Sequence, residues 1–460
     1  MKPALLARLQ KRLGKSAVQT APPPEFSGDK WFAQTRPDVV VFPSSTEEVA
    51  IVLREASRAG VPVTPRGAGF GYVGGCTPVH KGIVLSLDRM NRIREIHPKD
   101  FVAVVQSGVI TGDLQAAARK KNLLYPPDPA SLKDCSIGGN IATNAGGPRC
   151  LKYGVTRNYI LGLEVVLADG TIIRCGGRTH KNKTGFDLVG LFTGSEGLLG
   201  VVTEATLRLI PLPPARAALS AGFSSMRAAA AAIQSVFSGG FLPAAVEVAD
   251  RFTLDAARAF NPGANFPPGQ AQVILEVDGQ ASTVRSEANA LEKILHSSGA
   301  LAVAKATTPE ACEKLWGLRR VYSQSLKATG LKKLNEDIVV PRGRLVDLVR
   351  FAERLQKKTG FPIACFGHAG DGNIHTNIMV ADAENPAVQK KSRAALDELF
   401  HQVLAWKGSI TGEHGIGLAK MPWWDQAVPR ATRDLHATLK SALDPRGILN
   451  PGKFVASRPR

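Results

Sequence analysis

Short apolar runs alternate with amphipathic stretches along the first two hundred residues. Residues 45–48 form a Ser-Thr-Glu-Glu capping box, and the apolar positions after it recur every three or four residues, which predicts a helix over residues 45–59. Residues 113–121 predict a second helix, and residues 1–16 a short packing helix with four leucines on one face. The remaining apolar runs predict strands over residues 39–42, 61–64, 83–87, 102–106 and 201–210, and a hairpin over residues 163–175 with an Asp-Gly turn.

Strand and helix patterns also interleave in the second half, after a break. The break is the Pro-Leu-Pro-Pro run at residues 211–214, which predicts a domain boundary. Beyond it, the pattern predicts helices over residues 226–237, 309–327, 346–359 and 387–406, and strands over residues 272–277, 362–366 and 374–380. This order is typical of a second α+β domain.

Composition indicates a globular protein with a large core. The chain has 460 residues, of which 44% are hydrophobic, and this length suits two or three domains. We find no apolar run near the roughly 20 residues that span a bilayer, and residues 1–16 lack the features of a secretory signal. The six cysteines are scattered without a Cys-x-x-Cys pair. This argues against an iron–sulfur cluster or a structural zinc site and is typical of free thiols in the cytoplasm.

The net charge of +19 leaves several classes of anionic partner open. Nucleic acid is one, but the Lys and Arg residues form no arm, dense run or aromatic-interleaved patch. A positive field also attracts anionic cofactors and carboxylate substrates, and an acidic protein or an anionic membrane surface would fit too. Charge alone does not choose among these partners.

Three blocks of small residues in the first half have the character of phosphate-binding loops. They are PRGAGFG (residues 65–71), SIGGNIATNAGG (136–147) and TGSEGLLG (193–200). The first overlaps a G-x-G-x-x-G pattern, but a strand follows it where a Rossmann unit requires a helix, so we do not predict a nicotinamide site. Backbone N–H groups without side-chain obstruction bind anions, and three such blocks together predict a long ligand with several phosphates. Each block alone could be only a turn.

Two glycine-rich segments in the second half carry three imidazoles and a carboxylate. The first, GHAGDGNIHTN (residues 367–377), lies between two predicted strands, so a hairpin would bring His368 beside His375. The second, GEHGIG (residues 412–417), adds Glu413 and His414. Together they offer two His and one Glu to a metal with an open position, and one His for proton transfer. For either segment alone, turn residues or satisfied core histidines are the simpler interpretation.

These segments resemble a known family. Residues 65–75, 126–147, 153–154 and 194–197 resemble the FAD-binding domain of the vanillyl-alcohol-oxidase superfamily, and residues 367–377 and 412–417 resemble the FAD-linked oxidase C-terminal domain. The pairing is typical of FAD-dependent D-2-hydroxyacid dehydrogenases, which include the glycolate oxidase D subunit, cytochrome-type D-lactate dehydrogenase and D-2-hydroxyglutarate dehydrogenase.

The resemblance implies an α+β fold in four parts. An N-terminal helix and spacer (residues 1–34) would precede a two-part FAD-binding domain of PCMH type (35–213). A C-terminal α+β substrate and metal domain with an antiparallel sheet would follow (214–420), and a last segment (421–460) would return to the FAD domain.

The resemblance also implies which residues contact FAD. Members that attach FAD covalently use a His in the first loop, where this chain has Phe70 and Tyr72 and no His, so we predict dissociable FAD. The implied contacts are Pro65, Arg66, Gly67, Ala68, Gly69, Phe70, Gly71, Pro127, Asp128, Ser131, Gly138, Gly139, Asn140, Thr143, Asn144, Gly146, Glu196, Gly200, Val201, Val202 and Asn450.

By the same resemblance, a divalent metal, Zn or Mn, would be bound by His368, His375 and Glu413. His414 would act as general base, with a structural turn residue or a fourth metal ligand as its alternative role. Arg319 would bind the substrate carboxylate, with a surface salt bridge as the alternative, and Asn377 the substrate hydroxyl.

The position of a substrate-binding lysine separates this chain from hydroxyglutarate-type members. Where they have that lysine, this chain has Asn335, with Lys332 and Lys333 nearby. We therefore expect oxidation of a small D-2-hydroxy acid, of the D-lactate or glycolate type, to the 2-oxo acid. The metal would polarise the hydroxyl, His414 would remove its proton, and hydride would pass to the flavin.

Reduced flavin requires an electron acceptor, because the chain has no haem or iron–sulfur motif of its own. An iron–sulfur subunit, a cytochrome, an electron-transfer flavoprotein and a quinone are the candidates, and direct oxidation by O₂ is a further route. We expect a cytoplasmic protein, with contact at the inner membrane face and a homodimer left open. Two alternatives are a zinc-type metallohydrolase that uses the same His and Glu residues, and an anion- or nucleic-acid-binding protein driven by charge.

Overall fold

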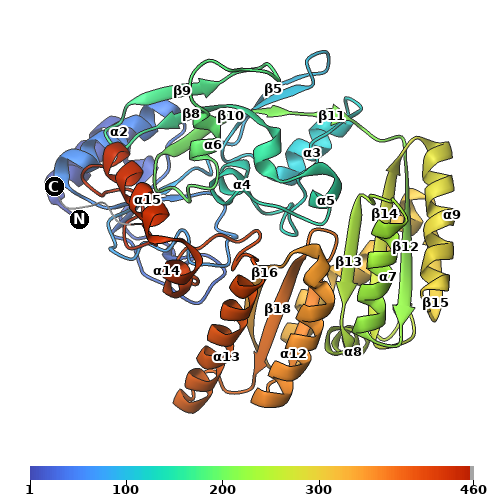
Figure 1. The fold of residues 1–460 in the computed structure, drawn as a ribbon. Coiled ribbons are helices and arrows are strands. Elements are labelled where there is room, and N and C mark those ends of the chain that lie inside the picture. Colours follow the sequence, from blue (N-terminus) through green and yellow to red (C-terminus); the bar gives the residue numbers. More distant parts are fainter. Residues whose placement is uncertain (456–460) are drawn as a thin grey trace. The chain divides into compact units, whose positions relative to one another are not determined.

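The computed structural model describes residues 1–455, and its chain divides into two compact units (Figure 1). Unit 1 contains Met1–Gly146, Val155–Leu212 and the described part of Glu413–Arg460, and unit 2 contains Gly147–Gly154 and Pro213–Gly412. The division differs from the boundaries expected from the sequence at three places. Residues 147–154 and Pro213 belong to unit 2, and residues 413–420 belong to unit 1.

Unit 1 contains a four-stranded sheet beside an N-terminal helix pair. Its strands, in spatial order, are β1 (Val18–Gln19), β2 (Val39–Val41), β4 (Ile83–Ser86) and β3 (Val63–Arg66). Helix α2 (Thr46–Ala59) begins at Ser45, whose hydroxyl accepts a hydrogen bond from the Glu48 N–H, as the capping box predicts. In α1 (Pro3–Leu13), Leu5 and Leu9 are fully buried in the same core as α2, which confirms the packing role of the first helix.

A five-stranded antiparallel sheet forms the second part of unit 1. In spatial order it contains β5 (Ile93–His97), β6 (Val102–Gln106), β10 (Val201–Arg208), β8 (Ile160–Val166) and β9 (Ile172–Gly176). The expected hairpin is β8–β9, and its turn has Gly170 at a φ of 83°. The short pair β7 (Leu123–Leu124) and β11 (Ile210–Pro211) and the helices α3 (Thr111–Arg119), α4 (Ile137–Thr143), α5 (Cys150–Tyr153, part of unit 2) and α6 (Leu188–Phe192) complete this stretch.

Unit 2 is built on a seven-stranded antiparallel sheet, as expected for the substrate domain. Its spatial order is β15 (Ala302–Ala306), β12 (Ala215–Phe223), β14 (Ala271–Gly279), β13 (Ala245–Ala249), β17 (Ile363–His368), β18 (Asn373–Val380) and β16 (Lys332–Val339). One face is packed by α7 (Met226–Ser238), α9 (Ala281–Ser297), α12 (Leu345–Thr359) and α13 (Pro386–Ala405). The other is packed by α8 (Arg251–Phe260), α10 (Pro309–Arg320) and α11 (Tyr322–Ala328).

Several elements differ from the sequence prediction. The helix expected over residues 309–327 is two helices, because α10 ends and α11 begins on either side of Val321. The apolar pattern also gave no prediction for β13, α8, α9, β16 and α15 (Arg430–Leu443). Among residues 1–455, no helix combines the length and apolar character needed to cross a membrane.

Candidate active site

The three small-residue blocks of the first half meet in unit 1. The Ala68 N–H of the first block donates to Ser136 Oγ of the second at 3.2 Å. The Gly194 and Glu196 N–H groups of the third donate to the carbonyls of Ile141 and Ala142 in the second, at 2.8 and 2.9 Å. We call these three joined blocks, residues 65–71, 136–147 and 193–200, the small-residue cradle.

Close backbone approach explains why the cradle is rich in glycine. A Cβ at Gly67 would lie 2.6 Å from Ser136 Oγ, and one at Gly138 would lie 2.7 Å from Ser107 Cβ. Ser136 caps α4, which places the small residues of the second block in the first turn of a helix. The N–H groups of that turn are bonded within the chain, those of Ile137 and Gly138 to the carbonyls of Val109 and Ser107 and that of Gly139 to Ser136 Oγ. The fit to the phosphate-bearing group that the sequence predicts therefore rests on the small side chains of the cradle, which let a long ligand lie close to its backbone.

Unsatisfied buried polar atoms near the cradle also fit a bound group. Arg66 Nε and Asn450 Oδ1 are buried and have no hydrogen-bond partner in the described part of the chain. Asn450 donates from Nδ2 to the carbonyls of Gly75 and Glu196, so the C-terminal segment reaches the cradle within unit 1. Since buried polar groups are normally paired, each of these two atoms is a candidate for a hydrogen bond to a ligand.

The other residues expected to contact FAD also lie in unit 1. Pro127 and Asp128 are buried, and the Pro127 carbonyl accepts from Gln115 Nε2 at 2.9 Å. Asn140 Nδ2 donates to Thr111 Oγ1, which fixes α4 to α3. The remaining expected residues lie in or beside α4, in the 129–135 turn, or at the start of β10: Ser131, Gly139, Thr143, Asn144, Gly146, Gly200, Val201 and Val202.

The carboxylate of Glu196 is bonded to the backbone of another loop. Its two oxygens accept from the Ile416 N–H at 2.8 Å and the Gly417 N–H at 2.9 Å, both within unit 1. Burial raises the pKa of Glu196 to about 7, although these N–H groups and two lysines oppose the shift. Glu196 thus holds the segment that directly follows His414. The ring of His414 lies beside that of Tyr72, with centroids 5.4 Å apart.

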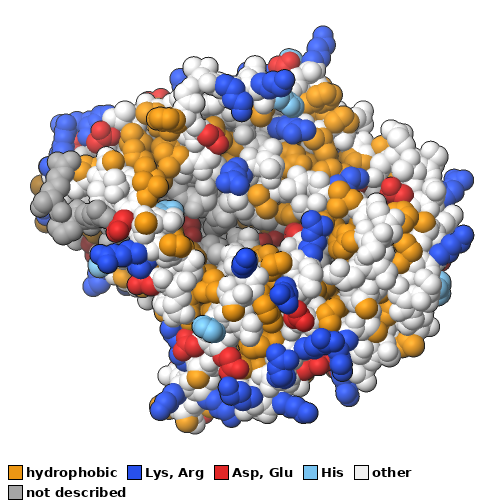
Figure 2. Space-filling model, in the orientation of Figure 1, with side chains coloured by type: hydrophobic (Ala, Val, Ile, Leu, Met, Phe, Trp, Pro, Cys, Tyr) orange, Lys and Arg blue, Asp and Glu red, His pale blue; other side chains and the backbone are white. Residues whose placement is uncertain are grey.

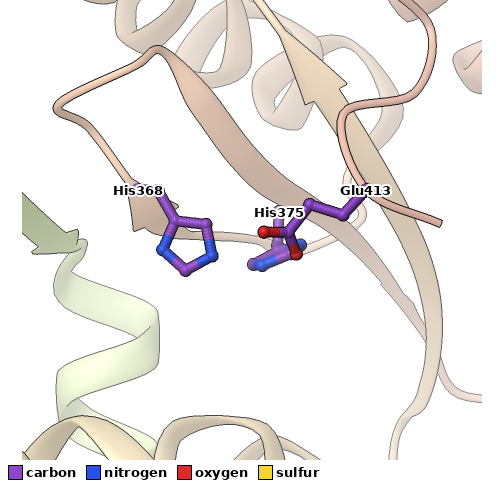
Figure 3. Close-up of side chains that lie close together, drawn as sticks. All are labelled: His368, His375 and Glu413. Carbon is purple, nitrogen blue, oxygen red and sulfur yellow. The ribbon is translucent and has the colours of Figure 1, made fainter. Parts of the chain in front are cut away.

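The two histidines of unit 2 lie side by side on the β17–β18 hairpin. Phe366 pairs with His375 and His368 with Asn373, so alternation puts both imidazoles on one face of the sheet, with ring centroids 5.6 Å apart. Glu413 immediately follows the last residue of unit 2, and its carboxylate points toward them (Figure 3). One ligand atom from each of the three residues lies within 4.8 Å of the others.

A buried carboxylate that the sequence prediction missed orients His368. Glu247 of β13 pairs in register with His368, and its Oε1 lies 2.5 Å from His368 Nδ1. With Nδ1 in this contact, Nε2 is the ring nitrogen of His368 that would bind an ion, an arrangement common among metal-bound histidines. Burial alone would raise the pKa of Glu247, but His368 and Arg319 outweigh it and lower the pKa to about 2. Two His and one Glu with an oriented imidazole fit a divalent metal that keeps an open position.

Asp337, also missed from the sequence, supports the third ligand. This fully buried side chain accepts from the Gly412 N–H at 2.9 Å, from Thr411 Oγ1 at 3.1 Å and from Asn373 Nδ2 at 2.6 Å. It therefore fixes the two residues before Glu413. For Glu247 the signal available in the sequence was a lone carboxylate within an apolar run, whereas Asp337 follows Asn335 and Glu336 and carried no such signal.

The two residues expected to bind substrate lie on the same face of unit 2. Arg319 Nε is ion-paired with Glu247, and its guanidinium lies 4.9 Å from the centre of the Phe366 ring. Asn377 is fully buried and donates from Nδ2 to the carbonyls of Ala364 and His375, while its Oδ1 has no partner among residues 1–455. Arg319 is thus mostly buried and belongs to the charge network of the histidines, which is not the surface salt bridge weighed as its alternative.

We call this side of the sheet the histidine face. Register pairing and alternation place on it Glu247, His368, His375, Asn377, Asp337, Asn335 and Lys333. The residues expected to hold FAD lie in unit 1, and the histidines, Arg319 and Asn377 lie in unit 2.

Comparison with known sequences identifies both parts of the chain. The model of the FAD linked oxidases, C-terminal domain, matches residues 212–454, and that of the FAD binding domain matches residues 37–176. The glycolate oxidase subunit GlcD of Bacillus subtilis (strain 168) is 39% identical over 93% of this chain and 91% of its own length. The chain belongs to the FAD-linked oxidase family.

Another relative and two solved structures agree with this family assignment. A D-lactate dehydrogenase of Anaerostipes hadrus is 33% identical over 92% of this chain and 90% of its own length. The 4-ethylphenol oxidase from Gulosibacter chungangensis has a TM-score of 0.77 at 21% identity, covering 99% of this chain and 97% of that one. For p-cresol methylhydroxylase the TM-score is 0.76 at 19% identity, with coverages of 99% and 96%. The α+β fold of PCMH type is confirmed, and this member of the FAD-linked oxidase family is an FAD-dependent oxidoreductase.

Proposed function

We propose that the chain oxidises a small D-2-hydroxy acid, of the D-lactate or glycolate type, to the 2-oxo acid with dissociable FAD. Two relatives that match over nine tenths of this chain are named glycolate oxidase subunit and D-lactate dehydrogenase. The observation that carries the proposal is the cluster of His368, His375 and Glu413, in which His368 shares the buried carboxylate of Glu247 with Arg319. That set combines groups for a metal with a cation for a carboxylate.

Each proposed role follows from a contact of the side chain. Arg319 uses Nε for Glu247, which leaves the terminal nitrogens of its guanidinium to bind the substrate carboxylate. Asn377, whose Oδ1 is buried and without a partner in the described chain, lies against the 2-hydroxyl and helps to orient it. His414 takes the hydroxyl proton on a ring nitrogen, and the segment after it is fixed by Glu196.

Two bound groups complete the chemistry. The residues proposed to hold a divalent ion, Zn or Mn, are His368, His375 and Glu413, and such an ion, when bound, lowers the pKa of a coordinated hydroxyl. The small-residue cradle is proposed to hold FAD, which when bound supplies the two-electron acceptor for the hydride at C2. The first loop carries Phe70 and Tyr72 and no His, which supports non-covalent FAD.

Electrons then leave the flavin for a second acceptor. We propose an iron–sulfur subunit, a cytochrome, an electron-transfer flavoprotein or a quinone, since one relative is itself named as a subunit of an oxidase. A homodimer and contact with the inner face of a membrane belong to the same proposal. Lys and Arg side chains are spread over many separate parts of the visible surface, without the single band expected for nucleic acid (Figure 2). The metallohydrolase alternative is not favoured, because it gives the FAD-binding domain no role.

The deciding experiment is anaerobic bleaching of the enzyme-bound flavin. We expect D-lactate or glycolate to bleach the flavin, L-lactate to act much more slowly, and a chelator to stop bleaching without releasing FAD. Addition of Zn²⁺ or Mn²⁺ should restore it. A matched pair of variants, Glu413→Gln and Glu384→Gln, whose glutamate is exposed, separates the proposed metal ligand from a general effect of charge. A flavin that stays oxidised with every D-2-hydroxy acid would contradict the proposed function.

A further inference from the structure

Two adjoining hollows lie on the outer helical layer of unit 2. The first has a volume of about 490 Å³ and is lined by side chains of α7 and α12. The second has a volume of about 320 Å³ and lies between the start of α12 and the end of α13. Arg350 and Arg354 of α12 line both, so we call the two together the α12 hollow. Its size is within the range of small-molecule sites.

The lining of the α12 hollow is strongly cationic. It contains five Arg and Lys side chains and only two carboxylates, those of Asp347 and Glu353. Asp347 pairs with Arg344 at 2.8 Å. Glu353 lies 3.9 Å from Arg227, which is at the limit of an ion pair. Figure 2 shows Lys and Arg side chains gathered over α12.

Three of these cations have no counterion within the described chain. Arg350, Arg354 and Lys357 are exposed on successive turns of α12, and none of them makes an ion pair with residues 1–455. Like charges three and four residues apart on a helix repel each other, which slightly destabilises α12. A hollow lined by one sign of charge concentrates the electric field and attracts counterions. The α12 hollow therefore attracts an anion from outside the chain.

An aromatic ring lies at one end of this cationic surface. Trp406, directly after α13, lines the second hollow together with Arg350 and Arg354, and it is only partly buried. Phe351 packs edge-on against it, with ring centroids 5.9 Å apart. A partly exposed indole suits the flat ring of a nucleobase, and arginines suit phosphate groups. The chemistry of a nucleotide matches both parts of the lining.

A lipid surface or an acidic protein matches this surface less well. Large exposed apolar side chains anchor a protein in a bilayer surface, but among residues 1–455 none of these belongs to α7, α12 or α13. An acidic protein surface would contact the rims of the α12 hollow, whereas the cations of its lining surround a compact group.

We propose that the α12 hollow binds a nucleotide with two or more phosphates, which contact Arg350 and Arg354 while the base stacks on Trp406. The site is separate from the histidine face. Helices α12 and α13 pack on one side of the seven-stranded sheet, whereas Phe366, two residues before His368, packs under α8 and α11 on the other. The inference goes beyond the proposed function, because it does not depend on which substrate is oxidised.

The test is titration of the FAD-saturated enzyme with ADP, and with inorganic pyrophosphate and AMP for comparison. Saturation with FAD keeps ADP out of the small-residue cradle, because FAD itself contains an ADP group. Calorimetry gives the dissociation constants, and tryptophan fluorescence reports contact with Trp406. We expect one saturable site per chain for ADP. Pyrophosphate, which lacks a base, and AMP, which lacks the second phosphate, should both bind more weakly.

Two variants separate the phosphate contacts from the base contact. Arg350→Gln/Arg354→Gln should weaken the binding of ADP and pyrophosphate about 30-fold or more, because charge-assisted hydrogen bonds are lost. Trp406→Leu should weaken ADP binding about tenfold and change pyrophosphate binding by less than about twofold. The matched control is Arg285→Gln/Lys293→Gln. It removes the same charge from exposed positions of α9 outside the hollow and should leave both dissociation constants unchanged.

Three results would overturn the inference. They are no saturable binding of ADP to the wild type, an equal loss of affinity in the α9 control, or a Trp406→Leu variant that weakens ADP and pyrophosphate alike at an unchanged melting temperature. If Trp406→Leu lowers the melting temperature, the exposed arginine pair decides. Vesicles of phosphatidylglycerol and a polyglutamate peptide test the other two partners. Binding of either through Arg350 and Arg354, without binding of ADP, would show that the surface serves a lipid or a protein.

Discussion

The small-residue cradle and the histidine face represent two ways of building a binding site. The cradle is made of backbone: three loops approach so closely that a single Cβ at Gly67 would lie 2.6 Å from Ser136 Oγ. The histidine face is made of side chains held by other buried side chains, such as Glu247 and Asp337. The cradle should lose affinity for its ligand when a side chain is added to it. The histidine face should lose metal affinity or catalytic rate when one of its charged side chains is removed.

The sharpest test of this contrast is the His414→Ala variant. Loss of the proposed proton acceptor should lower the rate of flavin reduction about a thousandfold, since general-base catalysis contributes factors of this order. Bound FAD should be unchanged, because the substitution adds no side chain to the cradle. Stopped-flow absorbance measures the rate and the flavin spectrum measures occupancy, with His401→Ala on the exposed side of α13 as control. A wild-type rate would remove His414 from the mechanism.

The Glu247→Gln variant tests how the histidine face is supported. We expect metal affinity to fall up to about 100-fold, because the carboxylate that orients His368 is lost while all three proposed ligands remain. Metal content after dialysis against graded chelator measures the change. Glu276→Gln is the control: this carboxylate on the neighbouring strand β14 is equally buried and pairs with Arg149, but it is not bonded to either histidine. Equal loss in both variants would mean that only stability was affected.

The Gly67→Ala variant tests the cradle. Its Cβ would displace the first block from Ser136 and Gly139, and overpacking of 1–3 kcal/mol corresponds to a loss of FAD affinity of about 5- to 150-fold. Fluorescence of released flavin measures it. At Gly75 a Cβ would meet nothing closer than 3.9 Å, so Gly75→Ala is the matched control and should retain FAD. If both variants behave alike, close approach is not what the glycines provide.

The smallest expected effect concerns pH and Glu196. Its folded-state pKa of about 7 exceeds the ordinary value of 4.5, so between these values the folded protein keeps a proton that the unfolded chain releases. Stability from this group is present at low pH and is lost as pH rises through about 7. Relative to Glu196→Gln, the wild type should lose at most about 1.4 kcal/mol of unfolding free energy per pH unit in this range. Urea unfolding at several pH values measures the difference, and parallel profiles would contradict the prediction.

The sequence predicted elements wherever one local signal was strong. The capping box at Ser45, the Asp-Gly turn at Gly170 and the glycine-flanked His368 and His375 each gave the correct local structure. Helix α9 was missed although its four buried residues recur at helical spacing over Ala281–Ser297, because its start at Gln280 carries no side-chain cap and no acidic first turn. Strand β16 was missed because polar side chains of the histidine face interrupt its apolar alternation.

The charged partners of the site could not be predicted because they depend on strand register. Glu247 lies more than a hundred residues before His368, and only the β13–β17 pairing makes them neighbours. Asp337 reaches Gly412 in the same way, across 75 positions. No spacing within the sequence encodes such contacts, whereas a glycine-rich loop carries its own conformational signal.

The interleaved path of the chain has a consequence for folding during its synthesis on the ribosome. Residues 213–412 form one continuous stretch of unit 2, but the core of unit 1 requires both ends of the chain. Ile448 and Leu449 pack with the N-terminal helices, and Lys440 donates to the carbonyls of Leu198 and Leu449. The core of unit 1 is therefore incomplete until nearly the whole chain has been synthesised. We expect chaperones to bind the incomplete N-terminal half during synthesis, and not the middle of the chain.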